Sequence, residues 1–234
     1  MVTSMPGSAS RAVDPLQGRP ALRASFEAAE QRWLEHWRRG PTRRAWTALP
    51  PQDGDPAPDV TLPDSTGAPV RLGSLWADQP TLLLFWRHWG CGCGVGRATL
   101  LREQYGALVE AGANVVVIGQ GEPDRAAWYA STFGIPCRVL CDVDASAYEA
   151  YGLLEMSPWL LLGEPKPDMA TFKAMIPEHR AKGRPVADNP FRLPGEFVID
   201  RTGRLVLTYR YQYCDNYPDL DTLTAAISEA NATS

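Results

Sequence analysis

Residues 82–96 read LLLFWRHWGCGCGVG, and this stretch decides both the fold and the candidate chemistry. The apolar run from Leu82 to Trp86 predicts a buried strand. A glycine-rich turn containing Cys91 and Cys93 follows, and the amphipathic pattern after it predicts a helix. At a helix N-terminus, unpaired backbone N–H groups and the positive end of the helix dipole favour the thiolate form of a cysteine. We therefore expect the chemistry of this protein at Cys91 and Cys93.

The spacing of the two cysteines favours a redox role. Cysteines separated by one residue form a disulfide only through a tight ring, which is typical of a labile redox couple and not of a structural crosslink. Two alternatives stay open: the cysteines pack as small buried residues, or Cys91, Cys93 and His88 bind copper or zinc. A nucleotide-binding loop is excluded, because the flanking glycines do not follow G-x-G-x-x-G and no G-x-x-x-x-G-K-[ST] occurs.

The composition limits the class of protein. The 234 residues, 44% of them hydrophobic, suffice for one substantial core with extensions. The net charge of −4 argues against a nucleic-acid partner, and no apolar stretch has the length of a membrane span. The N-terminal residues lack the pattern of a signal peptide, so the five cysteines are expected to be reduced thiols. We expect a cytoplasmic enzyme with neither a membrane nor a nucleic acid as partner.

The chain divides into a tail, a helical extension and a main domain. Apolar residues recur at helical spacing from Leu22 to Trp37, and this stripe packs on the chain's own domain or, alternatively, forms a homodimer contact. Residues 50–58, PPQDGDPAP, predict a stiff linker. We expect a flexible tail at residues 1–19 and a helical extension at residues 20–49. The main domain is expected at residues 56–232, with an insertion at residues 155–193.

The main domain alternates strands and helices until the insertion. The expected strands are residues 60–62, 70–72, 81–86, 115–118, 137–141, 197–200 and 205–212. Two of the expected helices end at Gly112 and Phe133. Three others span residues 145–151, 168–182 and 219–229. The order strand–helix–strand, an interruption, then hairpin and helix is the plan of the thioredoxin-like fold, an α/β fold with a central mixed sheet and helices on both faces. In that plan the reactive cysteine lies at the first strand–helix junction.

Several short motifs, in order along most of the chain, resemble the peroxiredoxin-like proteins of the AhpC/TSA (redoxin) family. The motifs are Ala57-Pro58-Asp59, Leu62-Pro63-Asp64, Phe85-Trp86-Arg87-His88-Trp89-Gly90-Cys91, Val117-Ile118-Gly119-Gln120-Gly121, Cys141-Asp142, Tyr151-Gly152, Leu193-Pro194-Gly195 and Phe197-Val198-Ile199-Asp200. The resemblance implies a thioredoxin-like fold, a thiol-dependent antioxidant reaction and no bound cofactor.

The resemblance also implies which cysteine reacts. The family's R-H-F-G-C turn corresponds to residues 87–91, which makes Cys91 the reactive cysteine. An ungapped comparison with the thioredoxin turn instead places Cys93 on the second, buried cysteine of that turn and Cys91 on a glycine. We favour Cys91 as the attacking thiol and Cys93 as the thiol that resolves the intermediate.

The sequence departs from the family at the peroxide-binding motif. True peroxiredoxins carry P-x-x-x-[ST]-x-x-C, but Leu84 and His88 occupy the Pro and Ser/Thr positions counted back from Cys91. His88 or Arg87 is expected to substitute for the missing hydroxyl, by donating hydrogen bonds and lowering the thiol pKa.

The expected substrate site contains Pro194, Trp89 and Gln120. Pro194 resembles the cis-proline that faces the reactive cysteine in this superfamily, and its missing N–H would leave neighbouring backbone groups free to pair with an extended substrate. Cys214 follows the last strand and is either a resolving thiol or an inert buried cysteine.

We therefore expect a thiol-dependent oxidoreductase that uses its CxC pair to reduce a peroxide or exchange disulfides. Its partners would be that small-molecule substrate and an external thiol or thioredoxin-like reductant. One alternative is a copper- or zinc-binding module. Another is a family member repurposed for a biosynthetic reaction, in which the apolar residues 159–162 of the insertion cover a bulky apolar substrate.

Overall fold

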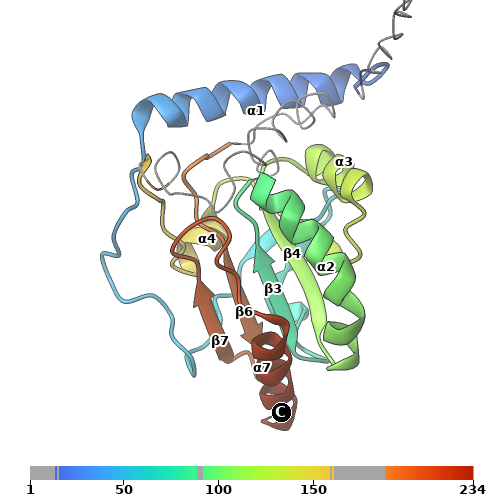
Figure 1. Ribbon diagram of the computed structural model, residues 1–234, viewed down its shortest axis with the longest axis vertical. Coiled ribbons are helices and arrows are strands. Elements are labelled where there is room, and N and C mark those ends of the chain that lie inside the picture. The colour runs from blue at the N-terminus through green and yellow to red at the C-terminus, as the bar shows by residue number, and fades with distance from the viewer. Residues whose placement is uncertain (1–13, 15, 89–91, 159, 161–187, 234) are drawn as a thin grey trace, which may run out of the picture.

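A five-stranded mixed sheet forms the centre of the computed structural model (Figure 1). The structure describes residue 14 and residues 16–88, 92–158, 160 and 188–233. The strand order is β5-β4-β3-β6-β7. The bounds are β3 Thr81–Phe85, β4 Asn114–Gln120, β5 Arg138–Asp142, β6 Gly195–Ile199 and β7 Leu205–Arg210. Strands β3, β4 and β5 run parallel, whereas β6 and β7 are antiparallel to their neighbours, which confirms the predicted mixed sheet.

Strand β3 lies in the middle of this sheet, and all five of its residues are buried. Its side chains alternate between the two faces, because successive residues of a strand point to opposite sides. Leu82 and Leu84 belong to one hydrophobic core, and Leu83 and Phe85 belong to the other. The continuous apolar run in the sequence therefore reflects a strand that is covered on both faces.

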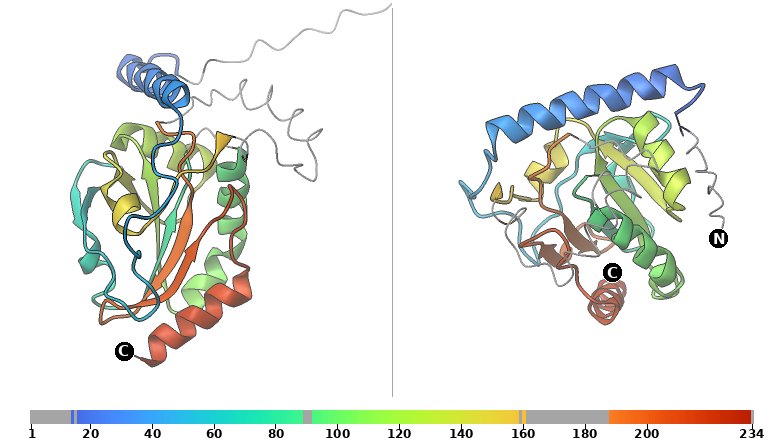
Figure 2. Two further views of the ribbon diagram at one scale, coloured as in Figure 1. Left: turned by 90° about the vertical axis from the view of Figure 1, so that its left-hand side faces the viewer. Right: turned by 45° about the horizontal axis from the view of Figure 1, so that its top comes forward.

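Different elements cover the two faces of the sheet (Figure 2). On one face pack three helices: α2 Gly92–Glu110, α3 Pro123–Phe133 and α7 Leu220–Ala232. On the other lie the short helices η1 Leu72–Ser74 and α4 Ser146–Ala150 and the hairpin of β1 Thr61–Pro63 and β2 Pro69–Arg71. Each of these elements was predicted except η1, although the bounds shift by a few residues. The predicted helix at 168–182 lies outside the described residues.

Helix α1 (Pro20–Arg39) crosses the edge of the sheet at which β3 ends (Figure 1). Proline at its first position and Gly40 after its last residue fit the usual signals for a helix start and end. The ring of Phe26 lies 5.2 Å from that of Trp128 on α3. Trp37 stacks on Phe191, with ring centroids 5.4 Å apart. The apolar stripe of α1 therefore packs on the chain's own domain.

The segment predicted as a stiff linker is attached to the domain instead. Gly54 N donates to Leu205 O at 2.7 Å, and Ala57 N donates to Gly203 O at 2.8 Å. Extended, proline-rich backbone presents N–H and C=O groups that an edge strand can pair with, and β7 is such an edge. No described helix is both long and apolar enough to span a membrane.

Candidate functional site

Cys93 lies in the first turn of α2, directly beyond the carboxyl end of β3. It is half-buried and disulfide-bonded, whereas Cys137, Cys141 and Cys214 are reduced. The position is the predicted strand–helix junction, where unpaired N–H groups of the first helical turn favour negative charge on sulfur. Cys91 and Trp89, also predicted for the site, lie outside the described residues.

A small cavity of about 20 Å³ borders Cys93. A volume of this size holds about one water molecule. The side chains around it come from the end of β3, the start of α2, the residues before β6 and the loop after β7. They are Phe85, Trp86, Arg87, Cys93, Gly94, Arg97, Pro194, Tyr211, Cys214 and Tyr217. The fold thus brings two cysteines and two arginines to the border of one small cavity.

Arg87 is the cation nearest the start of the cysteine turn in sequence, and the residue is only 4% exposed. Its guanidinium donates a hydrogen bond to Pro190 O. Burial lowers the pKa of Arg87 to about 10, and the charge interaction with Cys214 opposes that change. Arg87 therefore keeps its positive charge at neutral pH, as its predicted role as an electrostatic substitute requires.

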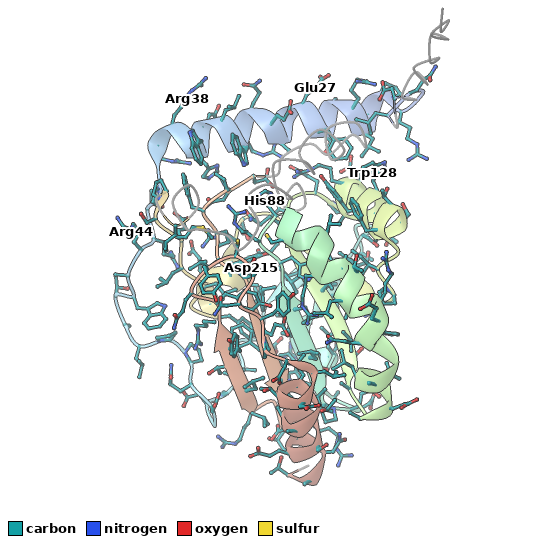
Figure 3. All side chains as sticks on the ribbon, in the orientation of Figure 1. Glu27, Arg38, Arg44, His88, Trp128 and Asp215 are labelled. Atoms are coloured by element: carbon teal, nitrogen blue, oxygen red, sulfur yellow. The ribbon has the colours of Figure 1, made fainter. Side chains whose placement is uncertain are left out.

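His88 is 6% exposed and lies at the end of β3 nearest α1 (Figure 3). Burial, and then the charge of Arg87, hold the pKa of His88 well below its ordinary value. The ring is consequently neutral at neutral pH and can act only through a hydrogen bond. Its Nδ1 has no hydrogen-bond partner among the described residues. Of the two predicted substitutes for the family's hydroxyl, Arg87 alone supplies charge.

Gln120, at the end of β4, connects the cysteine turn to the segment before β6. Its Nε2 donates to Arg87 O and, at 3.2 Å, to Asn189 O, and its Oε1 accepts from Asn189 N at 3.1 Å. Both ends of the amide are thus engaged within the protein. This arrangement favours a positioning role for Gln120 over the predicted contact with substrate.

Pro194 borders the cavity beside Cys93, but the predicted cis form is wrong, because the described residues contain no cis peptide bond. The trans form is the intrinsically favoured one. It also suits the neighbouring pairing: Leu193 N donates to Leu154 O at 2.9 Å, and Tyr211 N donates to Pro194 O at 3.1 Å. Both bonds hold this stretch against its neighbours with the proline trans.

A buried ion pair next to Cys93 was not predicted from the sequence. Arg97, one helical turn after Cys93, donates to both carboxylate oxygens of Glu196 on β6, and Tyr211 donates to the same carboxylate. The guanidinium of Arg97 also lies over the ring of Tyr217, 5.3 Å from its centroid. The available signal was the charge of Glu196 within the otherwise apolar strand GEFVI.

A larger cavity, of about 720 Å³, lies at the carboxyl ends of β4 and β5 beneath the end of α1. Its lining is mostly polar and includes Arg43, Glu149 and Asp142. Burial raises the pKa of Asp142 to about 6. Gln120 also lines this cavity, whereas Cys93 is not among its described lining residues. The predicted copper or zinc site includes Cys91 and therefore extends beyond the described residues; within them, no group of three or more His, Cys, Asp or Glu could hold a metal ion.

The sequence model of the AhpC/TSA family matches residues 54–208. A thioredoxin-like protein of Arabidopsis thaliana, AAED1, is 30% identical over 91 residues, which are 39% of this chain and 37% of that protein. A Mycobacterium tuberculosis protein that carries the name peroxiredoxin is 31% identical over 99 residues, 42% of this chain and 62% of that protein. The chain thus spans between about one third and two thirds of the length of these relatives.

Solved structures show the same fold. Peroxidoxin BcpB from Mycobacterium tuberculosis has a TM-score of 0.56 at 19% identity, covering 76% of this chain and 97% of that one. Thiol peroxidase from Chromobacterium violaceum has a TM-score of 0.55 at 16% identity, covering 82% and 92%. At such identities the likeness concerns the fold alone. Because the family model matches residues 54–208, more than half of the chain, the protein belongs to the AhpC/TSA family.

Proposed function

We propose that this protein is a thiol-dependent oxidoreductase that reduces a peroxide or exchanges disulfides through Cys91 and Cys93. The observation that carries the proposal is the disulfide-bonded state of Cys93 in the first turn of α2, beside the buried cation of Arg87. Membership of the AhpC/TSA family supports the same reaction class. We place the reaction in the cytoplasm, with an external thiol or a thioredoxin-like protein as reductant.

The proposed peroxide reaction balances within the CxC pair. The Cys91 thiolate attacks one peroxide oxygen, the O–O bond breaks, and Cys91 becomes a sulfenic acid while water or an alcohol leaves. The Cys93 thiolate then attacks the sulfenic sulfur and releases water as the CxC disulfide closes. An external dithiol then reduces that disulfide by thiol–disulfide exchange, which returns Cys91 and Cys93 to the thiol form and leaves the dithiol oxidised. With a disulfide substrate, Cys91 attacks a sulfur and Cys93 resolves the mixed disulfide.

Two neighbouring groups fit the charge changes of this cycle. Arg87 stays positively charged and can stabilise negative charge on sulfur or on the departing oxygen. His88 is neutral and can donate one hydrogen bond. The family hydroxyl, which would position a peroxide, is absent from the corresponding place, residue 88. This absence favours a disulfide over a peroxide as the better substrate.

The proposal is tested by intact-mass measurement with thiol trapping, before and after one equivalent of hydrogen peroxide or of a small disulfide. We expect the reduced protein to lose two hydrogens, and Cys93→Ser to retain a trapped sulfenic acid or a mixed disulfide on Cys91. Cys137→Ser, which removes a reduced cysteine that does not border the cavity, is the matched control and should behave like the wild type. Unchanged turnover in Cys91→Ser and in Cys93→Ser, with both variants folded, would refute the proposal.

A further inference from the structure

Cys214 lies in the loop after β7, and its side chain borders the same 20 Å³ cavity as Cys93. It is reduced and only 7% exposed. The two cysteines thus border one small cavity that has room for about one water molecule. Cys93 also packs against the apolar cluster to which Cys214 belongs, together with Met156, Phe191 and Leu193. The buried thiol of Cys214 thus lies near the disulfide-bonded Cys93.

The charge beside Cys214 suits thiol–disulfide exchange. Arg87 borders the same cavity, and its positive charge interacts with Cys214. In such an exchange the nucleophile and the leaving group are both thiolates, so a fixed cation stabilises charge at the start and at the end of the step. The Cys214 Sγ also lies 3.9 Å from Asp215 Oδ1, and this exposed carboxylate can accept the thiol proton.

The loop that carries Cys214 is held in place by its own hydrogen bonds. Asn216 Oδ1 accepts from Gln212 N at 3.0 Å and from Tyr213 N at 3.1 Å. At its start, Tyr211 binds Glu196, the partner of Arg97. The position of Cys214 opposite the start of α2 is therefore a product of the folded loop. Cys137 and Cys141 are reduced as well, but neither borders the cavity at Cys93.

We propose that Cys214 is a third redox thiol, which takes over the disulfide of Cys93. The Cys214 thiolate attacks the Cys93 sulfur; the existing bond to Cys93 breaks, the Cys93–Cys214 bond forms, and the former partner of Cys93 leaves as a thiolate that takes up one proton. Two electrons stay with the departing sulfur, so the exchange needs no external oxidant or reductant. The inference rests on the proposed function, and it assigns to Cys214 the role of accepting the disulfide from the CxC pair on a buried thiol.

The test uses Cys91→Ser, in which Cys93 has lost its expected partner, after full reduction and mild oxidation with diamide. We expect a loss of two hydrogens and a crosslinked Cys93–Cys214 peptide in a non-reduced digest. Cys91→Ser/Cys137→Ser should give the same crosslink, whereas Cys91→Ser/Cys214→Ser should not lose two hydrogens. If Cys91→Ser leaves Cys214 open to alkylation after unfolding, while Cys93 carries a diamide or small-thiol adduct, the inference is wrong.

Failure of the proposed function gives a different result. In that case Cys91→Ser and Cys93→Ser would both keep full turnover with peroxide and with disulfides. If Cys93→Ser is inactive but no Cys93–Cys214 crosslink forms in Cys91→Ser, only the role of Cys214 is refuted. A wild-type protein trapped with acid during turnover should contain the Cys93–Cys214 crosslink as a minor species, and Cys141→Ser should not change its amount.

Discussion

Arg97 and Glu196 form a two-point ion pair, with Nε to Oε1 at 2.9 Å and Nη2 to Oε2 at 3.1 Å. The two side chains are 6% and 2% exposed. Burial by itself would lower the pKa of Arg97, but Glu196 and Tyr211 raise it above its ordinary value. The pair joins the first turns of α2 to β6 and so fixes the helix that carries Cys93 against the sheet.

We predict that Arg97→Met lowers the free energy of unfolding by about 3–5 kcal/mol, because it leaves the Glu196 carboxylate buried without its cation. Urea unfolding at neutral pH measures the change. In Arg97→Met/Glu196→Leu both charges are gone, and most of the lost stability should return. A single variant as stable as the wild type would show that the pair does not hold α2 in place.

His88 should make stability depend on pH in the mildly acidic range. Its native pKa lies well below the ordinary value of 6.5, so the unfolded chain binds the proton first. Stability is then fully present above about pH 6.5 and falls below it, by about 1.4 kcal/mol per pH unit. His88→Gln should remove this slope, so the wild-type and variant unfolding free energies should differ by about 2 kcal/mol more at pH 7 than at pH 5.

Asp142 acts in the opposite direction, which is why the His88 effect must be measured as a difference. The pKa of Asp142 is raised to about 6, so the native state takes up this proton before the unfolded chain does. Its cost to stability is present above that pKa and is relieved as the pH falls. Because both proteins contain Asp142, its contribution cancels. Parallel stability curves for wild type and His88→Gln would contradict the assignment.

Phe26 should hold α1 on the domain. Its ring contacts Trp128 and Tyr129 edge-on, with centroids 5.2 and 6.0 Å apart. Phe26→Ala should cost about 3 kcal/mol and speed hydrogen exchange throughout α1. Glu27→Ala is the matched control, since Glu27 is exposed on the side of α1 away from Trp128 (Figure 3). Equal exchange in the two variants would show that the ring contacts do not hold the helix.

Cys137 and Cys141 should resist alkylation in the native protein. Burial raises the pKa of each thiol to about 12. At pH 8 only about one thiol in ten thousand would be ionised, and the thiolate is the reactive form. After mild reduction, iodoacetamide should modify Cys93 well before either of them, and all three equally in urea. Rapid native labelling of Cys141, by peptide mass mapping, would contradict this prediction.

The sequence alone determined most of the fold. The apolar run of β3, the glycines that end α1, α2 and α3, and the Asp200–Gly203 turn between β6 and β7 are local signals, because they depend on residues a few positions apart. Local signals of the same kind also predicted that the cysteine turn lies at the strand–helix junction. They failed for residues 50–58, since whether extended backbone is a linker depends on the presence of an edge strand to pair with.

Only the tertiary structure decided what surrounds Cys93. Arg97 and Glu196 are 99 residues apart in the chain, and Cys214 reaches the cavity through the loop after the last strand. Sequence reasoning left Cys214 between two roles and expected either His88 or Arg87 to replace the missing hydroxyl. Burial gives His88 and Arg87 different charges. A histidine loses its proton when it is desolvated beside a cation, whereas a guanidinium keeps its proton. Burial and ion pairs between residues far apart in the chain arise from tertiary packing. They therefore cannot be predicted from residues that are close together in the sequence.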